Sequence, residues 1–245
     1  KLRLLVNKGF TPRMVGRVEG MVRQRAADIV DRVAPLGECD FVNDIAAALP
    51  LEIICEMMGI PPADYRRIYE LTNTILGVGD PEYATTIPEL LGAGTELFQY
   101  AQALGAERLA EPKDDITSAL MHAEVDGQRL SAQEFGSFFI LLVAAGNETT
   151  RNAISHGMKV LTEWPDERRR WQADFERHKA TAVEEIVRWA TPVIHFRRTA
   201  ARDTELGGQP IRAGDKVVTW YIAANRDPEV FPDPYRFDVT RSPND

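Results

Sequence analysis

The sequence predicts a mainly α-helical protein with a small β region towards its C-terminal end. Apolar residues recur every three or four positions through most of the chain up to residue 190, as they do on the buried faces of helices. From Val193 to Tyr221 the pattern changes to short apolar segments separated by Gly207–Gly208 and Ala213–Asp215, which is typical of strands and hairpin turns. The remaining residues are rich in proline and aromatic side chains without a period, so we expect an ordered coil.

Caps and breakers set the helix boundaries in the first half of the chain. Thr11–Pro12 is a suitable start, because threonine caps free backbone amides and proline fits the first helical position. The apolar stripe that follows is ended by Gly37. Gly59–Pro62 ends the next helix, and Gly77–Pro81 separates the two after it. After the first helix, we expect helices at 41–58, 63–77 and 86–110, and a short one from the turn at 111–115 to His122.

A long helix is expected at the centre of the chain. Ser131 and Glu134 form a capping box, in which the serine accepts from the backbone and the glutamate reaches back to it. The apolar pattern then runs to Trp164–Pro165, over about 30 residues or ~45 Å. A helix of that length crosses a whole domain, so we expect its central residues to lie deep inside. One more helix is expected over 178–190, because the residue before Pro192 avoids helical angles.

The centre of the long helix, Ala144–Asn152, departs from helical preference. Gly146 costs about 1 kcal/mol relative to alanine, and Glu148 beside two threonines helps the helix little. Such departures concentrate at functional sites. Thr149 lies one turn after Ala145, so its hydroxyl can bond the Ala145 carbonyl and loosen the helix. The residues leave two readings equally open: a polar notch that handles protons or a diatomic ligand, and a close helix crossing with solvated side chains.

Composition excludes several classes of function. Hydrophobic content of 44% and charged content of 27% are those of an ordinary folded protein. The net charge of −8 argues against a nucleic-acid surface, which needs clustered lysine and arginine. The longest apolar run, Phe138–Gly146, is too short to span a bilayer, so no membrane anchor is visible. Cys39 and Cys55 suggest no disulfide framework and favour a reducing cytoplasm. The four histidines show no metal-ligand spacing.

Two groups of charged residues follow the long helix. Glu185 and Arg188 share one helix face, where a surface pair contributes only about 0.2–0.5 kcal/mol. Arg236, in the coil, is placed to bring a second guanidinium to Glu185. Arg197 and Arg198 stand in an apolar segment, where one of two adjacent strand residues faces inward. A buried arginine needs an anionic partner, which a ligand carboxylate or a protein carboxylate would supply equally well.

Four segments in this order resemble the motifs of bacterial cytochromes P450, which are haem-thiolate monooxygenases. Ala145–Thr149 resembles the oxygen-binding stretch of the family's long helix, and Glu185–Arg188 matches its Glu-x-x-Arg motif. Ala224–Pro228 is a frequent bacterial variant of the next segment, and Phe231–Phe237 matches the meander. The resemblance covers essentially the whole chain. It implies a single partial cytochrome P450 domain over 1–245, with a helical body over 1–190 and a β region and meander over 191–245.

The resemblance also assigns roles to individual residues. Glu148 and Thr149 are implied to be catalytic and to deliver protons to iron-bound dioxygen. Glu185, Arg188 and Arg236 are implied to form a structural triad on the proximal side of the haem, with Arg241 as a less favoured third member. The residues implied to bind haem b (iron protoporphyrin IX) are Arg3, Ala145, Gly146 and Arg198, and those implied to contact substrate are Val193, Ile194, His195 and Phe196.

The family's haem ligand is a cysteine just beyond the meander. This sequence stops before that point, and Cys39 and Cys55 stand in unrelated contexts, so no metal ligand is assigned within the chain. We interpret the chain as part of a longer protein, lacking the N-terminal portion and the loop that carries the cysteine ligand.

The function implied by the resemblance is insertion of one oxygen atom from O2 into a C–H bond of a hydrophobic substrate. Electrons are expected to come from NAD(P)H through a ferredoxin and its reductase. The stretches 146–152 and 186–193 resemble actinobacterial enzymes that hydroxylate sterol side chains or methyl-branched lipids. Two alternatives are a peroxygenase, which uses peroxide and needs no redox partner, and a haem-free helical fragment that binds lipid or a protein partner. The intact Glu148–Thr149 pair argues against the peroxygenase.

Overall fold

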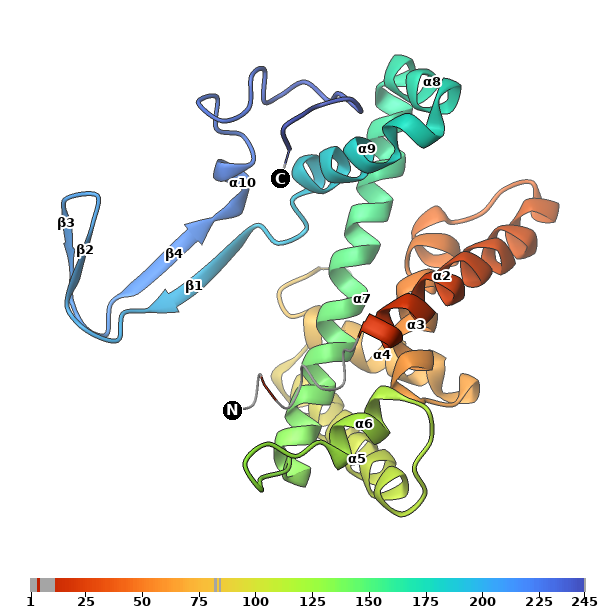
Figure 1. Ribbon diagram of the computed structural model, residues 1–245, viewed down its shortest axis with the longest axis vertical. Helices are drawn as coiled ribbons and strands as arrows, with labels where there is room; N and C mark the ends of the chain where they lie inside the picture. Colours follow the sequence, from red (N-terminus) through yellow and green to blue (C-terminus); the bar gives the residue numbers. More distant parts are fainter. Residues whose placement is uncertain (1–3, 5–11, 82, 84, 245) are drawn as a thin grey trace. The chain divides into compact units, whose positions relative to one another are not determined.

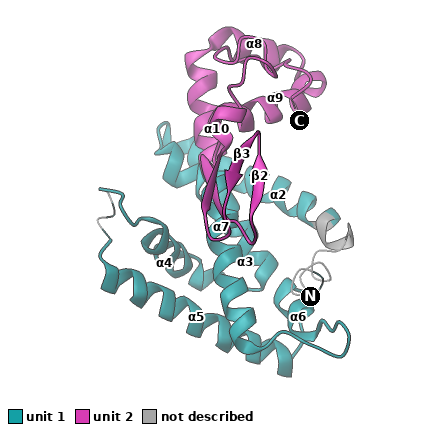
Figure 2. Cartoon of the chain, turned by 90° about the vertical axis from the view of Figure 1, so that its left-hand side faces the viewer, with its two compact units in different colours: residues 1–151 teal, residues 152–245 magenta. Residues whose placement is uncertain are grey.

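The computed structural model describes residues 4, 12–81, 83 and 85–244 (Figure 1). The chain divides into two compact units, 1–151 and 152–245 (Figure 2). The mainly helical class with a small β region is confirmed. The boundary between the units lies inside the long helix α7 (Ala132–Glu163), and not at the change of sequence pattern after residue 190. We describe each unit by itself.

The regular elements among the described residues of unit 1 are helices and helical turns, apart from one isolated β-bridge between Val125 and Gln128. Its capping box forms as predicted, because the Ser131 amide donates to Glu134 Oε2 at 2.9 Å and the Glu134 amide donates to Ser131 Oγ at 3.2 Å. The long helix that follows is confirmed to within a residue of its predicted end. The other described elements of this unit are α2 (Pro12–Val33), a 3-10 turn (Ala34–Leu36), a π-helical turn (Phe41–Ala46), α3 (Ala48–Met58), a 3-10 turn (Pro62–Asp64), α4 (Tyr65–Leu76), α5 (Ile87–Ala110) and α6 (Ile116–His122).

The prediction of a single helix over 41–58 is wrong in one respect, because this segment is divided into the π-helical turn and α3. Pro50 explains the division. A proline inside a regular helix lacks an amide donor and clashes with the carbonyl four residues earlier, but it is tolerated in the first turn. By starting again at Ala48, the chain places Pro50 in the first turn of α3. The π-helical turn has its own cap, because Asp40 Oδ1 accepts from the amides of Val42 and Asn43 at 3.0 Å.

The core of unit 1 packs α7 against the shorter helices. Phe135 and Phe139 of α7 are fully buried, with their ring centroids 6.1 Å apart. At Gly136 the helix comes so close to α5 that a Cβ atom would lie 2.6 Å from the Phe98 ring. The glycine therefore permits the close approach of the two helices. Other buried members of this core are Cys55, Met58, Ile68, Leu97, Leu104, Ile116, Leu120 and Val143.

A buried ion pair joins the ends of three helices in unit 1. The Arg108 Nε group of α5 donates to Asp115 Oδ2 at 2.6 Å, and the two side chains are only 4% and 6% exposed. Arg108 Nη2 also donates to the carbonyl of Gly59, which follows α3, at 2.7 Å. Asp115 Oδ1 accepts from the Ser118 amide at 2.7 Å and so caps α6.

Unit 2 begins with the end of α7 and continues into α8 (Pro165–Ala173) and α9 (Phe175–Ala190). The helix predicted over 178–190 begins earlier than expected, and α8 was not predicted although Pro165 fits the first helical position. The small core of the unit consists of Val160, Ala182, Phe237 and Val239, with Trp164 and Trp189 packed against it.

The predicted β region is confirmed as two antiparallel pairs of strands. β1 (His195–Thr199) pairs with β4 (Lys216–Trp220), and β2 (Thr204–Leu206) pairs with β3 (Gln209–Ile211). Gly207 and Gly208 connect β2 to β3 with positive φ angles of 57° and 79°, as two-residue hairpin turns require. A short helix, α10 (Tyr221–Ala224), leads into the coil. No helix among the described residues is long and apolar enough to cross a membrane.

We expect Asp115→Ala to lower the free energy of unfolding by about 3–5 kcal/mol, because Arg108 would stay buried without its counterion. Glu107→Ala is the matched control. Glu107 contacts the same guanidinium, but from an exposed position, with 51% of its side chain accessible. Its loss is expected to cost no more than ~1 kcal/mol. Urea unfolding of both variants measures the difference, and equal costs would contradict the structural role of the buried pair.

Candidate functional site

The centre of α7 contains the hydrogen bond that the sequence predicts. Thr149 Oγ1 donates to the carbonyl of Ala145 at 2.9 Å, which confirms the contact expected from their spacing. Because the hydroxyl hydrogen is used within the helix, the lone pairs of Oγ1 stay available to accept a hydrogen bond. Ala145 is exposed, and so is Leu141, with 61% of its surface accessible. Leu141, Ala145 and Thr149 follow one another at four-residue intervals and therefore share a face of the helix.

Glu148, next to this face, is ion-paired with Arg151. Arg151 Nη2 donates to Glu148 Oε2, and Arg151 Nη1 donates to Asn73 Oδ1 of α4 at 3.3 Å. The Arg151 side chain is 12% exposed and that of Glu148 is 29% exposed. Burial alone would lower the pKa of Arg151, but the hydrogen bond and charge of Glu148 outweigh it and raise the pKa above its ordinary value. The guanidinium therefore stays charged at any physiological pH.

Gly146 and Asn147 face the interior of unit 1. A Cβ atom on Gly146 would lie 3.7 Å from Ile54 of α3, which is ordinary van der Waals contact. The described neighbours would therefore accommodate an alanine at this position. Asn147 is 2% exposed, and its Oδ1 atom has no hydrogen-bond partner in the described part of the chain. An orphaned buried acceptor of this kind is uncommon in folded proteins.

Glu185 lies at the centre of a charged network in unit 2. The carboxylate is fully buried, and Arg188 holds it with two parallel bonds, Nε to Oε2 at 2.7 Å and Nη2 to Oε1 at 2.8 Å. Arg188 Nη1 also donates to the carbonyls of Asn225 and Pro234 at 2.8 and 2.9 Å. This arginine therefore ties α9 to the coil in two places. Bidentate pairing of this kind is the strongest form of the interaction.

The second guanidinium on Glu185 belongs to Arg241, so the prediction of Arg236 as the third member of the triad is wrong. Arg241 Nε lies 3.2 and 3.1 Å from the two carboxylate oxygens. Arg236 is exposed and contributes only its backbone carbonyl, which accepts from Arg241 Nη2 at 2.7 Å. The reason lies in the next residue. Phe237 is fully buried with its ring against Trp189, and the backbone that directs Phe237 inward leaves the Arg236 side chain outside.

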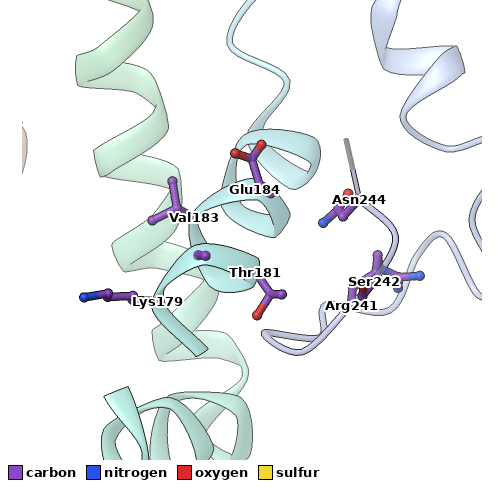
Figure 3. Close-up of a pocket in the computed structure, with 8 residues that line it drawn as sticks. Lys179, Thr181, Val183, Glu184, Arg241, Ser242 and Asn244 are labelled. Atoms are coloured by element: carbon purple, nitrogen blue, oxygen red, sulfur yellow. The ribbon is translucent and has the colours of Figure 1, made fainter. Parts of the chain in front are cut away.

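Arg241 also lines a pocket of ≈510 Å³ between α9 and the end of the coil (Figure 3). Thr181 lines it from the helix and Asn244 from the coil. Thr181 Oγ1 donates to the Val239 carbonyl at 2.7 Å, and Asn244 Nδ2 donates to Glu185 Oε2 at 3.0 Å. These two side chains hold the coil on α9, so their role in the pocket is structural.

The strand β1 is open to solvent within unit 2. All its residues are exposed, including Arg197 and Arg198, so the prediction that one of the two arginines is buried is wrong for the described chain. The β1–β4 pair has no further layer in its own unit. Arg198 Nη1 donates to the Arg197 carbonyl at 3.1 Å, and its Cζ atom lies 5.0 Å from the centre of the Phe196 ring. Among the described residues, Arg198 has no carboxylate partner.

Of the residues expected to contact substrate, Ile194, His195 and Phe196 are exposed and Val193 is half-buried. The imidazole of His195 packs against the ring of Trp220 of β4 at a tilt of 41°, with the ring centroids 4.9 Å apart. Arg3 lies outside the described residues.

Comparison with known proteins identifies the family. The model of the cytochrome P450 family matches residues 92–242. The chain belongs to the cytochrome P450 family. It is 51% identical over 247 residues to a methyl-branched lipid omega-hydroxylase of Mycobacterium tuberculosis, with 100% of this chain and 58% of the relative covered. It is 44% identical over 244 residues to a steroid C26-monooxygenase of Mycolicibacterium smegmatis, covering 100% of this chain and 56% of that protein.

Solved structures agree with this assignment. A cytochrome P450 of Mycobacterium marinum in complex with pseudoionone matches with a TM-score of 0.94 and 47% identity over 100% of this chain and 60% of that one. Substrate-free cytochrome P450 of Bacillus megaterium matches with a TM-score of 0.90 and 32% identity over 99% and 64%. The P450 chain therefore spans less than two thirds of the length of the relatives it matches.

Two features of the P450 chain fit a haem. In unit 1, α7 presents the exposed apolar residues Leu141 and Ala145, which suit the flat face of a porphyrin. In unit 2, Arg198 is exposed and has no carboxylate partner in the described chain, which suits a propionate. Cys55 does not suit the iron. Burial raises the pKa of the Cys55 thiol to about 12, so it stays protonated at neutral pH, and thiolate is the form that binds metals. Cys39 is exposed.

Sequence reasoning missed three residues of the network around these sites. Arg151 was detectable, because its three-residue spacing from Glu148 places both on one helix face. Asn73 was not, because 78 residues separate it from Arg151. Arg226 donates to the carbonyls of Arg188 and Trp189 at 2.9 and 2.7 Å and so caps the end of α9. Burial, assisted by the nearby charge of Arg188, lowers the pKa of Arg226.

We expect Arg241→Ala to destabilise the protein by about 1.5–3 kcal/mol, because it removes charged hydrogen bonds from a buried carboxylate. Arg236→Ala is the matched control. It removes an exposed guanidinium and keeps the carbonyl that the network uses, so its effect is expected to stay within about 0.5 kcal/mol. Thermal and urea unfolding measure both. A greater loss of stability in Arg236→Ala than in Arg241→Ala would support the triad of Glu185, Arg188 and Arg236 that the sequence predicted.

Proposed function

We propose that the protein containing this chain is a haem-dependent monooxygenase that inserts one oxygen atom from O2 into a C–H bond of a hydrophobic substrate. The observation that carries the proposal is the Glu148–Thr149 pair on α7, with the Thr149 hydroxyl bonded to the Ala145 carbonyl, in a chain of the cytochrome P450 family. When bound, the haem supplies the oxygen activation and the one-electron chemistry.

This chain holds the haem through apolar and ionic contacts. Ala145 and Leu141 contribute the apolar surface of α7, and Gly146 keeps the neighbouring position small. Arg198 would pair with one propionate, and Arg3 is proposed for the other. The support for Arg198 is its exposed guanidinium without a carboxylate partner in the described chain. The ligand to iron is proposed to be a cysteine outside this sequence, as in the family.

The polar residues of α7 handle protons. The Glu148 side chain is 29% exposed, so its carboxylate is accessible to water. Thr149 Oγ1 donates its own hydrogen to the Ala145 carbonyl, so its lone pairs are oriented to accept a hydrogen bond and to hold the proton-carrying group in place. A positioned acid contributes about 10²–10⁴-fold to a proton-transfer step. The pair therefore has the two properties that delivery requires, which are access to solvent and a fixed acceptor oxygen.

The substrate is proposed to be a sterol side chain or a methyl-branched lipid. The support comes from the relatives, named a methyl-branched lipid omega-hydroxylase and steroid C26-monooxygenases. Val193, Ile194 and Phe196 are apolar and accessible on the segment proposed to contact it, with His195 between them. Electrons are proposed to arrive from NAD(P)H through a ferredoxin and a ferredoxin reductase. A reducing cytoplasm is proposed from the two free cysteines.

Thr149→Ala is expected to uncouple electron use from hydroxylation in the haem-loaded protein, with product per NAD(P)H falling about ten-fold while NAD(P)H oxidation continues. Thr150→Ala is the control, because Thr150 is the exposed neighbour on the same helix and lacks the bond to Ala145. The measurement is the ratio of product formed to NAD(P)H consumed. Unchanged coupling in Thr149→Ala would exclude its role in proton delivery.

An absorption spectrum tests the haem itself. After reduction and addition of carbon monoxide, a strongly red-shifted Soret band is expected, because thiolate ligation would alter the haem electronics. Absence of haem absorbance after hemin is added would favour the haem-free binding protein. Turnover with peroxide alone, at the rate reached with the redox partners, would favour the peroxygenase.

A further inference from the structure

We propose that Arg151 is a positioning residue that fixes the Glu148 carboxylate of α7 by anchoring it to α4 through Asn73. The inference rests on the proposed function, because it assumes that Glu148 is the proton-delivering acid. It adds that the position of this acid is set by a second helix, α4, and not by α7 alone.

The geometry of the guanidinium supports this role. Arg151 uses two different nitrogens, Nη2 towards Glu148 and Nη1 towards Asn73 Oδ1 at 3.3 Å. A guanidinium presents five N–H donors in a rigid plane, so fixing one bond fixes the direction of the other. The Arg151 side chain is 12% exposed, and Asn73 is 8% exposed. Both partners of the 3.3 Å contact are therefore largely shielded from competing water.

Asn73 is a firm anchor because α4 is itself tied to α5. Ile68 and Leu71 of α4 are buried in the same apolar core as Leu97 of α5. Tyr100 OH of α5 also donates to Asp64 Oδ2, just before α4, at 2.8 Å. A displacement of α4 would carry Asn73 with it and change the hold of Arg151 on Glu148. The acid is thereby coupled to the packing of α4 and α5 in unit 1.

The pair differs from a surface ion pair on the same helix. Lys159 and Glu163 of α7 also form a pair, but their side chains are 66% and 50% exposed and their bond has no third partner in the described chain. Pairs of that kind contribute little and rearrange freely in water. Lys159→Gln is therefore a matched control for loss of one positive charge from α7.

Four variants of the haem-loaded protein test the inference: Glu148→Gln, Arg151→Gln, Arg151→Lys and Asn73→Ala. Product per NAD(P)H is expected to fall about ten-fold in Arg151→Gln, since a displaced acid loses part of its contribution. Arg151→Lys keeps the charge and is expected to recover part of the loss. Asn73→Ala is expected to lower coupling less than Arg151→Gln, and Lys159→Gln to leave it unchanged. Arg151→Gln is expected to add nothing in a Glu148→Gln background, whereas a merely structural role would be additive.

Hydrogen exchange of the substrate-free protein supplies a readout independent of turnover. Amides of α4 and of α7 around residue 148 are expected to exchange faster in Asn73→Ala and in Arg151→Gln, but at the native rate in Lys159→Gln. If Glu148→Gln itself leaves coupling unchanged, the acid assigned in the proposed function is wrong and this inference falls with it. Arg151 also has a side-chain hydrogen bond with Tyr69 of α4, so the anchor is removed fully only in the double variant Asn73→Ala, Tyr69→Phe. If Glu148→Gln lowers coupling while this double variant changes neither coupling nor exchange, the anchoring role is overturned and the acid stands. The double variant leaves the ion pair intact, so it decides the matter even where Arg151→Gln does not fold.

Discussion

A charge removed from water has to find an opposite charge and hydrogen bonds inside the protein, because an unpaired buried ion costs several kcal/mol. Each unit of this chain is organised by that constraint. In unit 1, Arg108 and Asp115 join the ends of α3, α5 and α6. In unit 2, the fully buried Glu185 forms ion pairs with Arg188 and Arg241. These pairs hold the C-terminal coil against α9. The coil is held in place by this carboxylate together with the buried side chains of Phe237 and Val239.

The site on α7 obeys a different rule. Its residues weaken the helix locally. Gly146 is a poor helix former, and the Thr149 hydroxyl donates a hydrogen bond to the Ala145 carbonyl of its own helix. Packing of Phe135 and Phe139 on the side that faces the core supplies the stability that the central turn lacks. The exposed face, with Leu141 and Ala145, is then free to serve a ligand. The helix can carry a weak segment because its first half is anchored by a large apolar core.

Contacts within one helix turn could be predicted from the sequence, because helix geometry fixes them. The bond from Thr149 to Ala145 is such a case, and the capping box at the start of α7 is another. Contacts between distant segments could not. Glu185 pairs with Arg241 and not with Arg236, because Phe237 is buried, and no local sequence pattern reveals that burial. The helix α8 was missed because its polar sequence, with three consecutive arginines, shows no apolar stripe.

The Glu148–Arg151 pair is intermediate in burial between the buried carboxylate of Glu185 and an ion pair on the surface, and this intermediate burial suits it to its proposed role. Glu185 is 0% exposed and is closed off from water by its charged partners, so it serves structure. An exposed pair such as Lys159–Glu163 is open to water but fixes no position. Glu148, at 29% exposure, is reachable by water while Arg151, at 12%, is held firmly enough to orient it. A group that delivers protons needs both properties at once, since an acid that is rigid but sealed cannot be recharged, and one that is open but mobile is seldom in place.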